Sequence, residues 1–158
     1  MLTDAQLQTL ATALRAETDQ TVVAALAIRN DVALAAWCNG ASAVDAWNEA
    51  MGSRDLFEAT DVTKFDAVNP GKRDAWRLLL EFAPINFSRQ KMRKAVPDVW
   101  GTTDAVAVLQ ACTRKATVAE SALGGNSATT GGVTAIKLNW EGTLSTDDVS
   151  YALNRNPV

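Results

Sequence analysis

Histidine is absent from the 158 residues of this chain. It is the side chain most often used for proton transfer near neutral pH and the commonest ligand of transition metals in proteins. Its absence excludes Ser-His-Asp catalysis, Cys-His catalysis and metal sites with histidine ligands. The two cysteines, Cys38 and Cys112, lack the CxxC or Cys/His spacing of a zinc site. We expect both to be reduced core residues.

The chain also lacks an apolar run of the ~20 residues that span a bilayer. The first residues, MLTDAQLQTL, carry an acidic side chain where a signal peptide would be positive. Charged residues make up 21% of the chain and hydrophobic residues 47%, which is typical of a globular domain with one core. We therefore expect a protein made in the cytoplasm that does not contact a membrane.

Helix-start patterns and apolar residues at helical spacing predict a series of short helices. Thr3 with Gln6 and Thr117 with Glu120 have the spacing of capping boxes, and Asn69 stands before a proline as a helix cap. Residues 53–68 have weaker periodicity and predict a loop or short helices. The predicted helices cover residues 4–16, 19–27, 32–38, 42–51, 70–83, 88–96, 103–112 and 117–123.

The last third of the chain changes character at the segment GGNSATTGG, residues 124–132. Its glycine, serine and threonine content predicts a flexible linker. Beyond it, apolar and polar residues alternate from Ile136 to Trp140, as in a β-strand with one apolar face, and Ser145 opens a short helix. The predicted fold is mostly α: a helical bundle of short helices (1–123), the linker (124–132) and a C-terminal extended arm (133–158).

The predicted strand in the arm has no strong partner in this sequence. Unpaired backbone groups are costly to bury, and residues 59–65 are the only weak candidate for a second strand. We therefore expect the arm to pair with another subunit or another protein. Its apolar partner-binding residues would be Ile136, Leu138, Trp140 and Leu144.

Two short motifs suggest chemistry but have simpler explanations. Ser88 and Lys91 have the S-x-x-K spacing of a serine activated by lysine, yet the companion motifs are missing and Ser88 can serve as a helix cap. The glycines of residues 124–132 lack the Gly-Lys-Ser/Thr of a phosphate loop. We assign no catalytic residue, no cofactor, no metal and no small-molecule substrate.

Charge is unevenly distributed along the sequence. Residues 1–63 contain three Lys/Arg and nine Asp/Glu, residues 64–94 eight and three, and residues 95–158 four and six, which gives net charges of −6, +5 and −2. The middle segment contains a basic band: Lys72, Arg73, Arg77, Arg89, Lys91, Arg93 and Lys94.

Three interpretations of the basic band remain open. It could contact the phosphates of nucleic acid, although the overall acidity weakens that case. It could meet the acidic region of a neighbouring subunit in a head-to-tail assembly. It could also be a solvated face without a partner.

Two stretches, KFDAVNPGKRDAWRLLLEFAPINFSRQKMRKAVPDVWG and ACTRKATVAESAL…WEGTLSTDDVSYAL, resemble a family of small structural proteins of tailed bacteriophages. The resemblance rests on Gly71-Lys72 with Trp76, on the pattern Arg114-x-Ala-Thr-x-x-Glu120, and on Gly142-x-Leu-Ser. It covers residues 64–153, and its motifs are helix caps and core positions.

The resemblance implies a helical head or neck protein of the virion, most similar to the head-to-tail adaptor, or connector. Such a protein forms a homo-oligomeric ring beneath the portal and docks on portal or tail proteins through an extended C-terminal segment. Transient contact with packaged DNA is then expected. The alternatives are a helical nucleic-acid-binding protein that uses the 64–94 band, and a capsid decoration or tail-completion protein.

Overall fold

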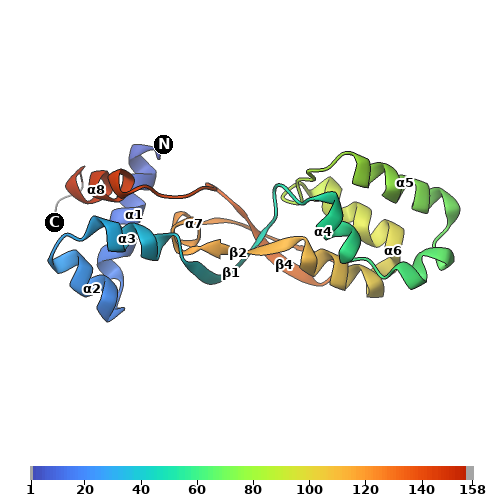
Figure 1. Cartoon of the computed structure of the whole chain (residues 1–158), viewed down its shortest axis with the longest axis horizontal. Coiled ribbons are helices and arrows are strands. Elements are labelled where there is room, and N and C mark those ends of the chain that lie inside the picture. Colours follow the sequence, from blue (N-terminus) through green and yellow to red (C-terminus); the bar gives the residue numbers. More distant parts are fainter. Residues whose placement is uncertain (1, 156–158) are drawn as a thin grey trace. The chain divides into compact units, whose positions relative to one another are not determined.

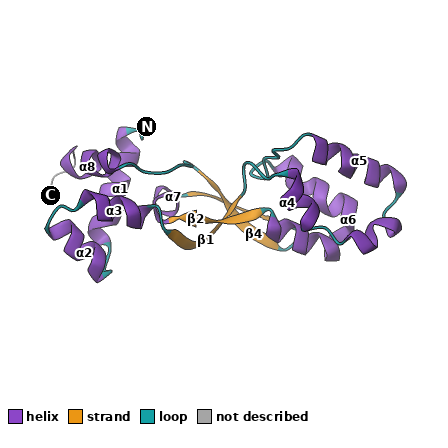
Figure 2. Ribbon diagram, viewed as in Figure 1, coloured by secondary structure: helices purple, strands orange, loops and turns teal. Residues whose placement is uncertain are grey.

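The computed structural model describes residues 2–155 and is mostly helical, as the sequence predicts (Figures 1 and 2). Nine helices and four strands are found in these residues. The helices are α1 (Asp4–Ala16), α2 (Gln20–Ala27), α3 (Asp31–Cys38), α4 (Ser53–Glu58), the 3-10 helix η1 (Val62–Ala67), α5 (Pro70–Glu81), α6 (Gln90–Ala111), α7 (Val118–Leu123) and α8 (Thr146–Arg155). The strands are β1 (Ala41–Trp47), β2 (Thr113–Thr117), β3 (Gly125–Thr130) and β4 (Val133–Leu138).

The chain divides into two compact units, each built from segments distant in sequence. Unit 1 comprises Met1–Val44, Lys115–Gly125 and Leu138–Val158, and unit 2 comprises Asp45–Arg114 and Asn126–Lys137. The expected single domain with a linker and an arm is therefore wrong. Each boundary between the units falls within one of the four strands.

Unit 1 contains α1, α2, α3, α7 and α8 around one apolar core. In α1 the buried residues Leu7, Leu10, Ala11 and Leu14 share one face, and the predicted capping box of Thr3 and Gln6 is present. Helix α8 contributes Val149, Ala152 and Leu153 to the same core. The last helix is thus an integral part of unit 1 and does not belong to a projecting arm.

Unit 2 has its own core, rich in tryptophan, beneath α4, α5 and α6. The rings of Trp76 and Trp100 meet edge to face with their centres 5.5 Å apart, and Phe65 contacts Trp100 at the same distance. Helix α6 joins the two helices predicted over 88–96 and 103–112. The break lies at Gly101 (φ 75°, ψ 171°), while Pro97 lies inside the first helical segment.

The four strands form one sheet in the order β2-β1-β4-β3, with β1 parallel to β4 and Ala46 opposite Ile136. The helix predicted over 42–51 is wrong, because residues 41–47 form β1. Strand β4 has β1 on one side and β3 on the other. The expectation that this strand pairs with another molecule is therefore also wrong: its backbone partners lie in the same chain.

The segment predicted as a linker is ordered as β3 and a tight turn. Gly131 and Gly132 have φ values of 55° and 82°, a conformation that glycine adopts readily and that suits a two-residue hairpin turn. The hydroxyls of Thr129 and Thr134 are hydrogen-bonded across the hairpin at 2.7 Å. A side chain at Gly131 would also approach Leu109 Cδ1 to 2.7 Å, so this position favours glycine sterically as well.

Candidate interaction surfaces

The four residues predicted to bind a partner are held within their own chain. Leu138 and Leu144 are buried, Ile136 is half-buried in β4, and Trp140 is half-buried against the core of unit 1. The backbone of Leu144 forms two hydrogen bonds with the side chain of Asn39: its N–H donates to Oδ1 at 2.8 Å, and its carbonyl accepts from Nδ2 at 2.9 Å. The structure gives these apolar side chains an intramolecular role.

The basic band is divided between α5 and the first turns of α6. Arg73 is half-buried with Nη1 3.5 Å from Asp66 Oδ1, and Arg77 lies 6.0 Å from the centre of the Phe65 ring. Arg93 is buried and does not belong to any exposed band. The band members that remain exposed are Lys72, Arg77, Arg89, Lys91 and Lys94.

Arg93 is occupied by hydrogen bonds inside unit 2. Its Nη1 donates to the carbonyls of Phe87 at 2.8 Å and Ser88 at 2.6 Å, and its Nε donates to Thr130 Oγ1 at 3.3 Å. Its guanidinium also lies 4.9 Å from the centre of the Trp47 ring. The periodicity of α6 could have indicated this, because Arg93 shares a helix face with the buried Val96 and Trp100.

The Ser88-Lys91 pair does not form a nucleophile with its base. Ser88 is buried, whereas Lys91 is exposed on the first turn of α6. The N–H of Ser88 donates to Asn86 Oδ1 at 2.9 Å, and Arg89 rather than Ser88 occupies the cap position of α6. Ser88 is therefore not the helix cap predicted from the sequence.

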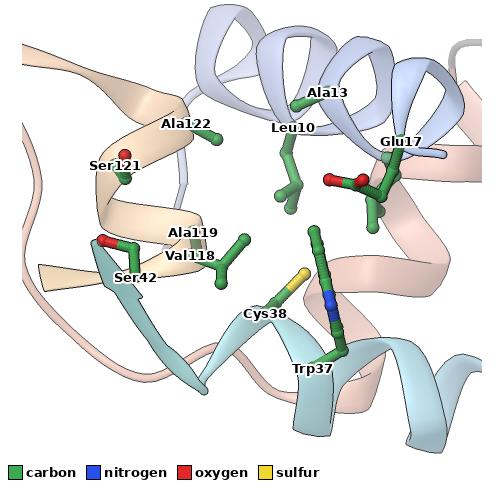
Figure 3. Close-up of a pocket in the computed structure, with 11 residues that line it drawn as sticks. Leu10, Ala13, Glu17, Trp37, Cys38, Ser42, Val118, Ala119, Ser121 and Ala122 are labelled. Carbon is green, nitrogen blue, oxygen red and sulfur yellow. The ribbon is translucent and has the colours of Figure 1, made fainter. Parts of the chain in front are cut away.

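A pocket of about 180 Å³ in unit 1 is mainly apolar (Figure 3). Figure 3 shows Leu10, Trp37 and Cys38 directed toward the same space, with Glu17 at its margin. Burial raises the pKa of the Cys38 thiol to about 11, so the thiol stays protonated at neutral pH. Glu17 Oε1 accepts hydrogen bonds from the N–H groups of Thr18 and Asp19 at 2.8 and 3.2 Å. This pocket offers neither an activated nucleophile nor a base placed against one.

An acidic groove of about 360 Å³ is lined by residues of α1, α8 and the start of the chain. Arg155 Nη1 lies 2.5 Å from Asp4 Oδ1, and its guanidinium lies 4.9 Å from the centre of the Tyr151 ring. Asp148 is used to cap α8, because its Oδ2 accepts from both the N–H and the hydroxyl of Ser145. Within residues 2–155, no cluster of three or more Cys, Asp or Glu side chains could hold a metal ion.

A third concave surface lies in unit 2, between the end of α5 and the start of α6. This groove has a volume of about 350 Å³. We call it the α5–α6 groove, and it is lined by Leu79, Phe82, Pro84, Ile85, Asn86, Arg89 and Met92. Sequence reasoning missed this surface, because Phe82 reads as a core residue of an amphipathic helix but is 72% exposed.

Unit 1 exposes a second apolar surface that was missed, at the bend between α2 and α3. We call it the α2–α3 corner and define it by Val23, Ile28 and Val32, which are 49%, 74% and 67% exposed. Val23 and Val32 lie within the helices predicted over 19–27 and 32–38, and Ile28 follows the first of these helices. Only the tertiary structure distinguishes them from Val22, Ala25 and Leu34, which are buried.

Comparisons with protein-family models, with curated proteins and with solved structures find no match for this chain. Among the described residues, no helix is both long and apolar enough to cross a membrane.

Proposed function

We propose that this protein is a non-enzymatic structural protein of a tailed-bacteriophage virion, a head-to-tail adaptor that forms a homo-oligomeric ring and docks on the portal. The observation that carries the proposal is the exposure of large apolar side chains on a chain that also has two packed cores. Phe82 lines one groove together with Leu79 and Met92, and grouped apolar side chains in solvent are typical of binding surfaces. Those that are 48–74% exposed are Val23, Ile28, Val32, Phe57, Val62, Leu78, Phe82 and Tyr151.

The distribution of charge supports self-association. Unit 1 contains four Lys/Arg and eight Asp/Glu, a net charge of −4, whereas unit 2 contains eleven and ten, a net charge of +1. Within unit 2, residues 64–94 contribute +5. Opposite charges on different parts of one chain favour a head-to-tail contact between copies and disfavour a contact between like surfaces.

The position in the virion is supported by the sequence resemblance of residues 64–153 to small structural proteins of tailed phages. Docking on the portal would use the exposed apolar surfaces, since β4 lies between two strands of its own sheet and has no free edge. Burial of apolar anchors and complementary charge would provide the binding energy. No chemical step is involved.

The position of the chain in intact particles tests this proposal. In particles of the phage that encodes the chain, a specific antibody should label the neck between head and tail. Inactivating the gene should leave DNA-filled heads without tails. Label spread over the capsid surface or confined to the tail would instead support a decoration or tail-completion protein, and the adaptor proposal would fail.

A helical nucleic-acid-binding protein is the second candidate, favoured by the five members of the basic band that remain exposed. Binding through phosphate contacts would weaken steeply as salt is raised. Retention of DNA by the purified chain, lost on replacing Arg89, Lys91 and Lys94 by glutamine, would support this function. If retention is absent at low salt, this candidate is excluded.

A further inference from the structure

The α5–α6 groove is held in shape by hydrogen bonds within its own unit. Ile85, which is buried and lines the groove, exchanges two backbone hydrogen bonds with Met51, each 2.9 Å long. The buried guanidinium of Arg93 donates to the carbonyls of Phe87 and Ser88, which follow Ile85 in the chain. The segment that joins α5 to α6 is therefore fixed, and the groove exists before any ligand binds.

The lining of the groove is mainly apolar. Leu79 and Met92 are half-buried, and Phe82 is 72% exposed. Leu78, which is 53% exposed, lies one helical turn before Phe82 and extends the apolar surface along α5 beyond the groove. Exposed apolar side chains that adjoin a groove are typical of surfaces that bind another molecule.

The charge in the groove has one sign. Arg89 is the only charged residue of the lining, and no ion pair among residues 2–155 involves it. Asn86 Oδ1 accepts from the N–H of Ser88 at 2.9 Å, whereas its Nδ2 donates no hydrogen bond within these residues. Glu81 precedes Phe82 in the chain but does not line the groove. A guanidinium and an amide N–H group beside an apolar surface favour a carboxylate from the ligand.

We propose that the α5–α6 groove binds a segment of another protein in which an aspartate or glutamate stands within about four residues of a large apolar side chain. The apolar side chain would lie against Leu79, Phe82 and Met92. The carboxylate would accept hydrogen bonds from Arg89 and Asn86. A basic segment would instead bring its cations toward Arg89, which costs free energy.

The extent of the apolar surface indicates a protein segment rather than a free small molecule. Small-molecule sites enclose most of the surface of their ligand, whereas Phe82 and Leu78 are both more than half exposed. A helix or an extended segment of a partner can cover the two side chains together and remove their apolar surface from water.

This inference rests on the docking step of the proposed function and states the chemistry of the segment that docks. A few buried apolar anchors provide most of the binding energy in protein interfaces. The charge-assisted hydrogen bond to Arg89 would fix the orientation of the segment and select acidic over basic partners. The portal or tail protein that binds this surface should therefore present an acidic, apolar segment.

Selection from a library of displayed short random peptides tests the site in the full chain. The immobilised chain is the target, and peptides that also bind the Phe82→Glu variant are removed. Because Phe82 is 72% exposed, this substitution should leave the melting temperature unchanged. We expect enrichment of peptides that combine Phe, Leu or Trp with a nearby Asp or Glu. Enrichment of basic peptides, or of none that distinguishes the chain from Phe82→Glu, would overturn the proposal.

The affinity of the most enriched peptide tests the charged contact separately. Arg89→Gln should weaken binding by about three- to tenfold, because a charge-assisted hydrogen bond is lost. Replacing the acidic residue of the peptide by its amide should then have no further effect on that variant. Lys94→Gln is the matched control, because Lys94 is exposed on α6 but does not line the groove. Equal losses in Arg89→Gln and Lys94→Gln would contradict a direct contact with Arg89.

A second control addresses the apolar contact. Val62→Glu adds the same charge as Phe82→Glu at a residue that is 53% exposed and lies outside the groove. The enriched peptide should bind Val62→Glu as tightly as it binds the unsubstituted chain. Loss of binding in this variant as well would show that added negative charge alone repels the peptide, and the groove would not be its site.

The outcomes separate this inference from the proposed function. If the antibody labels the neck of the virion but the selection yields no acidic, apolar peptide, the adaptor proposal stands and this binding site is wrong. If such peptides bind the groove but the label lies elsewhere in the particle, the binding site stands and the adaptor proposal is wrong.

Discussion

The guanidinium of Arg93 lies 4.9 Å from the centre of the Trp47 ring, and its Nη1 donates hydrogen bonds to two backbone carbonyls. The pair joins α6 to the end of β1 inside unit 2. A planar cation can stack on an indole and still donate in its own plane, which lysine cannot reproduce. The arginine therefore organises the core of unit 2, although the sequence suggests a surface residue.

Arg93→Lys should destabilise the protein by about 2–4 kcal/mol, because it leaves buried carbonyls without a donor and loses the contact with the ring. Urea denaturation followed by tryptophan fluorescence measures this loss. Lys94→Ala is the control, since Lys94 is exposed one position later and should change stability by less than about 0.5 kcal/mol. Equal effects of the two substitutions would contradict the assigned role of Arg93.

The buried thiols provide a prediction for alkaline pH. Burial raises the pKa of Cys38 to about 11 and of Cys112 to about 12, both above the ordinary value of 9.0. Because the folded-state pKa is raised, the folded protein favours the protonated thiols. The stability that this contributes is complete below pH 9 and is lost as pH rises through about 11 and 12. The melting temperature should therefore fall as pH rises over this range. Cys112→Ala has one buried thiol fewer, so its melting temperature should fall less below its own value at neutral pH than that of the unsubstituted chain does.

Thiol reactivity tests the same burial directly. At pH 8 we expect both cysteines to react with a thiol reagent much more slowly in the folded protein than in urea, where two thiols should titrate at the rate of a free cysteine. Fast reaction of either thiol in the folded protein would show that its unit opens readily.

A capping carboxylate gives the corresponding prediction for acid. The N–H of Ser145, and then its hydroxyl, hold the pKa of Asp148 below its ordinary value of 3.8. Because the folded-state pKa is lowered, the ionised carboxylate stabilises the protein at pH values above the ordinary pKa. This stability is lost as pH falls through the folded-state pKa. Asp148→Asn should cost about 1 kcal/mol at pH 7. The difference from the unsubstituted chain should shrink below pH 4. Asp147→Asn is the matched control, because Asp147 is the exposed neighbouring residue, and it should change stability by less than about 0.5 kcal/mol at pH 7.

Local features were largely predictable because they depend on neighbouring residues. The capping boxes of Thr3 and Thr117 are present with both reciprocal hydrogen bonds, and Asn69-Pro70 begins α5. The sequence predicts two helices, over 88–96 and 103–112, in place of α6, and the break in α6 at Gly101 lies between them. These interactions span at most four residues, so the sequence contains them completely.

The sheet was missed because its partners are distant in sequence. Residues 41–47 contain alanine and tryptophan at spacings that also suit a helix, and only pairing with β4, about 90 residues later, makes them a strand. The Gly131-Gly132 pair between two threonine-containing runs was the available hairpin pattern, and we interpreted it as a linker. Because β1 and β3 were not predicted, β4 had no predicted strand to pair with in its own chain. The prediction that it pairs with another molecule followed from that error.

The candidate surfaces depended on burial, which a single sequence does not determine. The sequence predicts Arg93 in a basic band and it is buried, whereas the apolar Phe82, at the end of the helix predicted over 70–83, suggests a core residue and is exposed. The helices that carry or precede these residues, α6 and α5, were predicted. What could not be predicted was which side of the helix meets the rest of the unit.

A buried glutamate provides the sharpest test of how the C-terminal segment is held. Glu120 is 2% exposed; its Oε2 accepts from the N–H of Thr117 at 2.8 Å, and its Oε1 accepts from the N–H of Gly142 at 3.2 Å. Glu120→Gln replaces one acceptor with an amide that donates, so one of these N–H groups would face another donor. We expect a loss of about 1–3 kcal/mol, together with faster hydrogen exchange at Gly142.

Ser121→Ala is the matched control, because Ser121 is the next residue of α7 and its hydroxyl forms no hydrogen bond among residues 2–155. A projecting arm would exchange fast at residues 139–145 in the unsubstituted chain, and Glu120→Gln would change nothing there. Slow exchange that the glutamine variant accelerates would instead establish that this segment is clamped to unit 1. Binding to any partner would then have to use surfaces other than β4 and the segment that follows it.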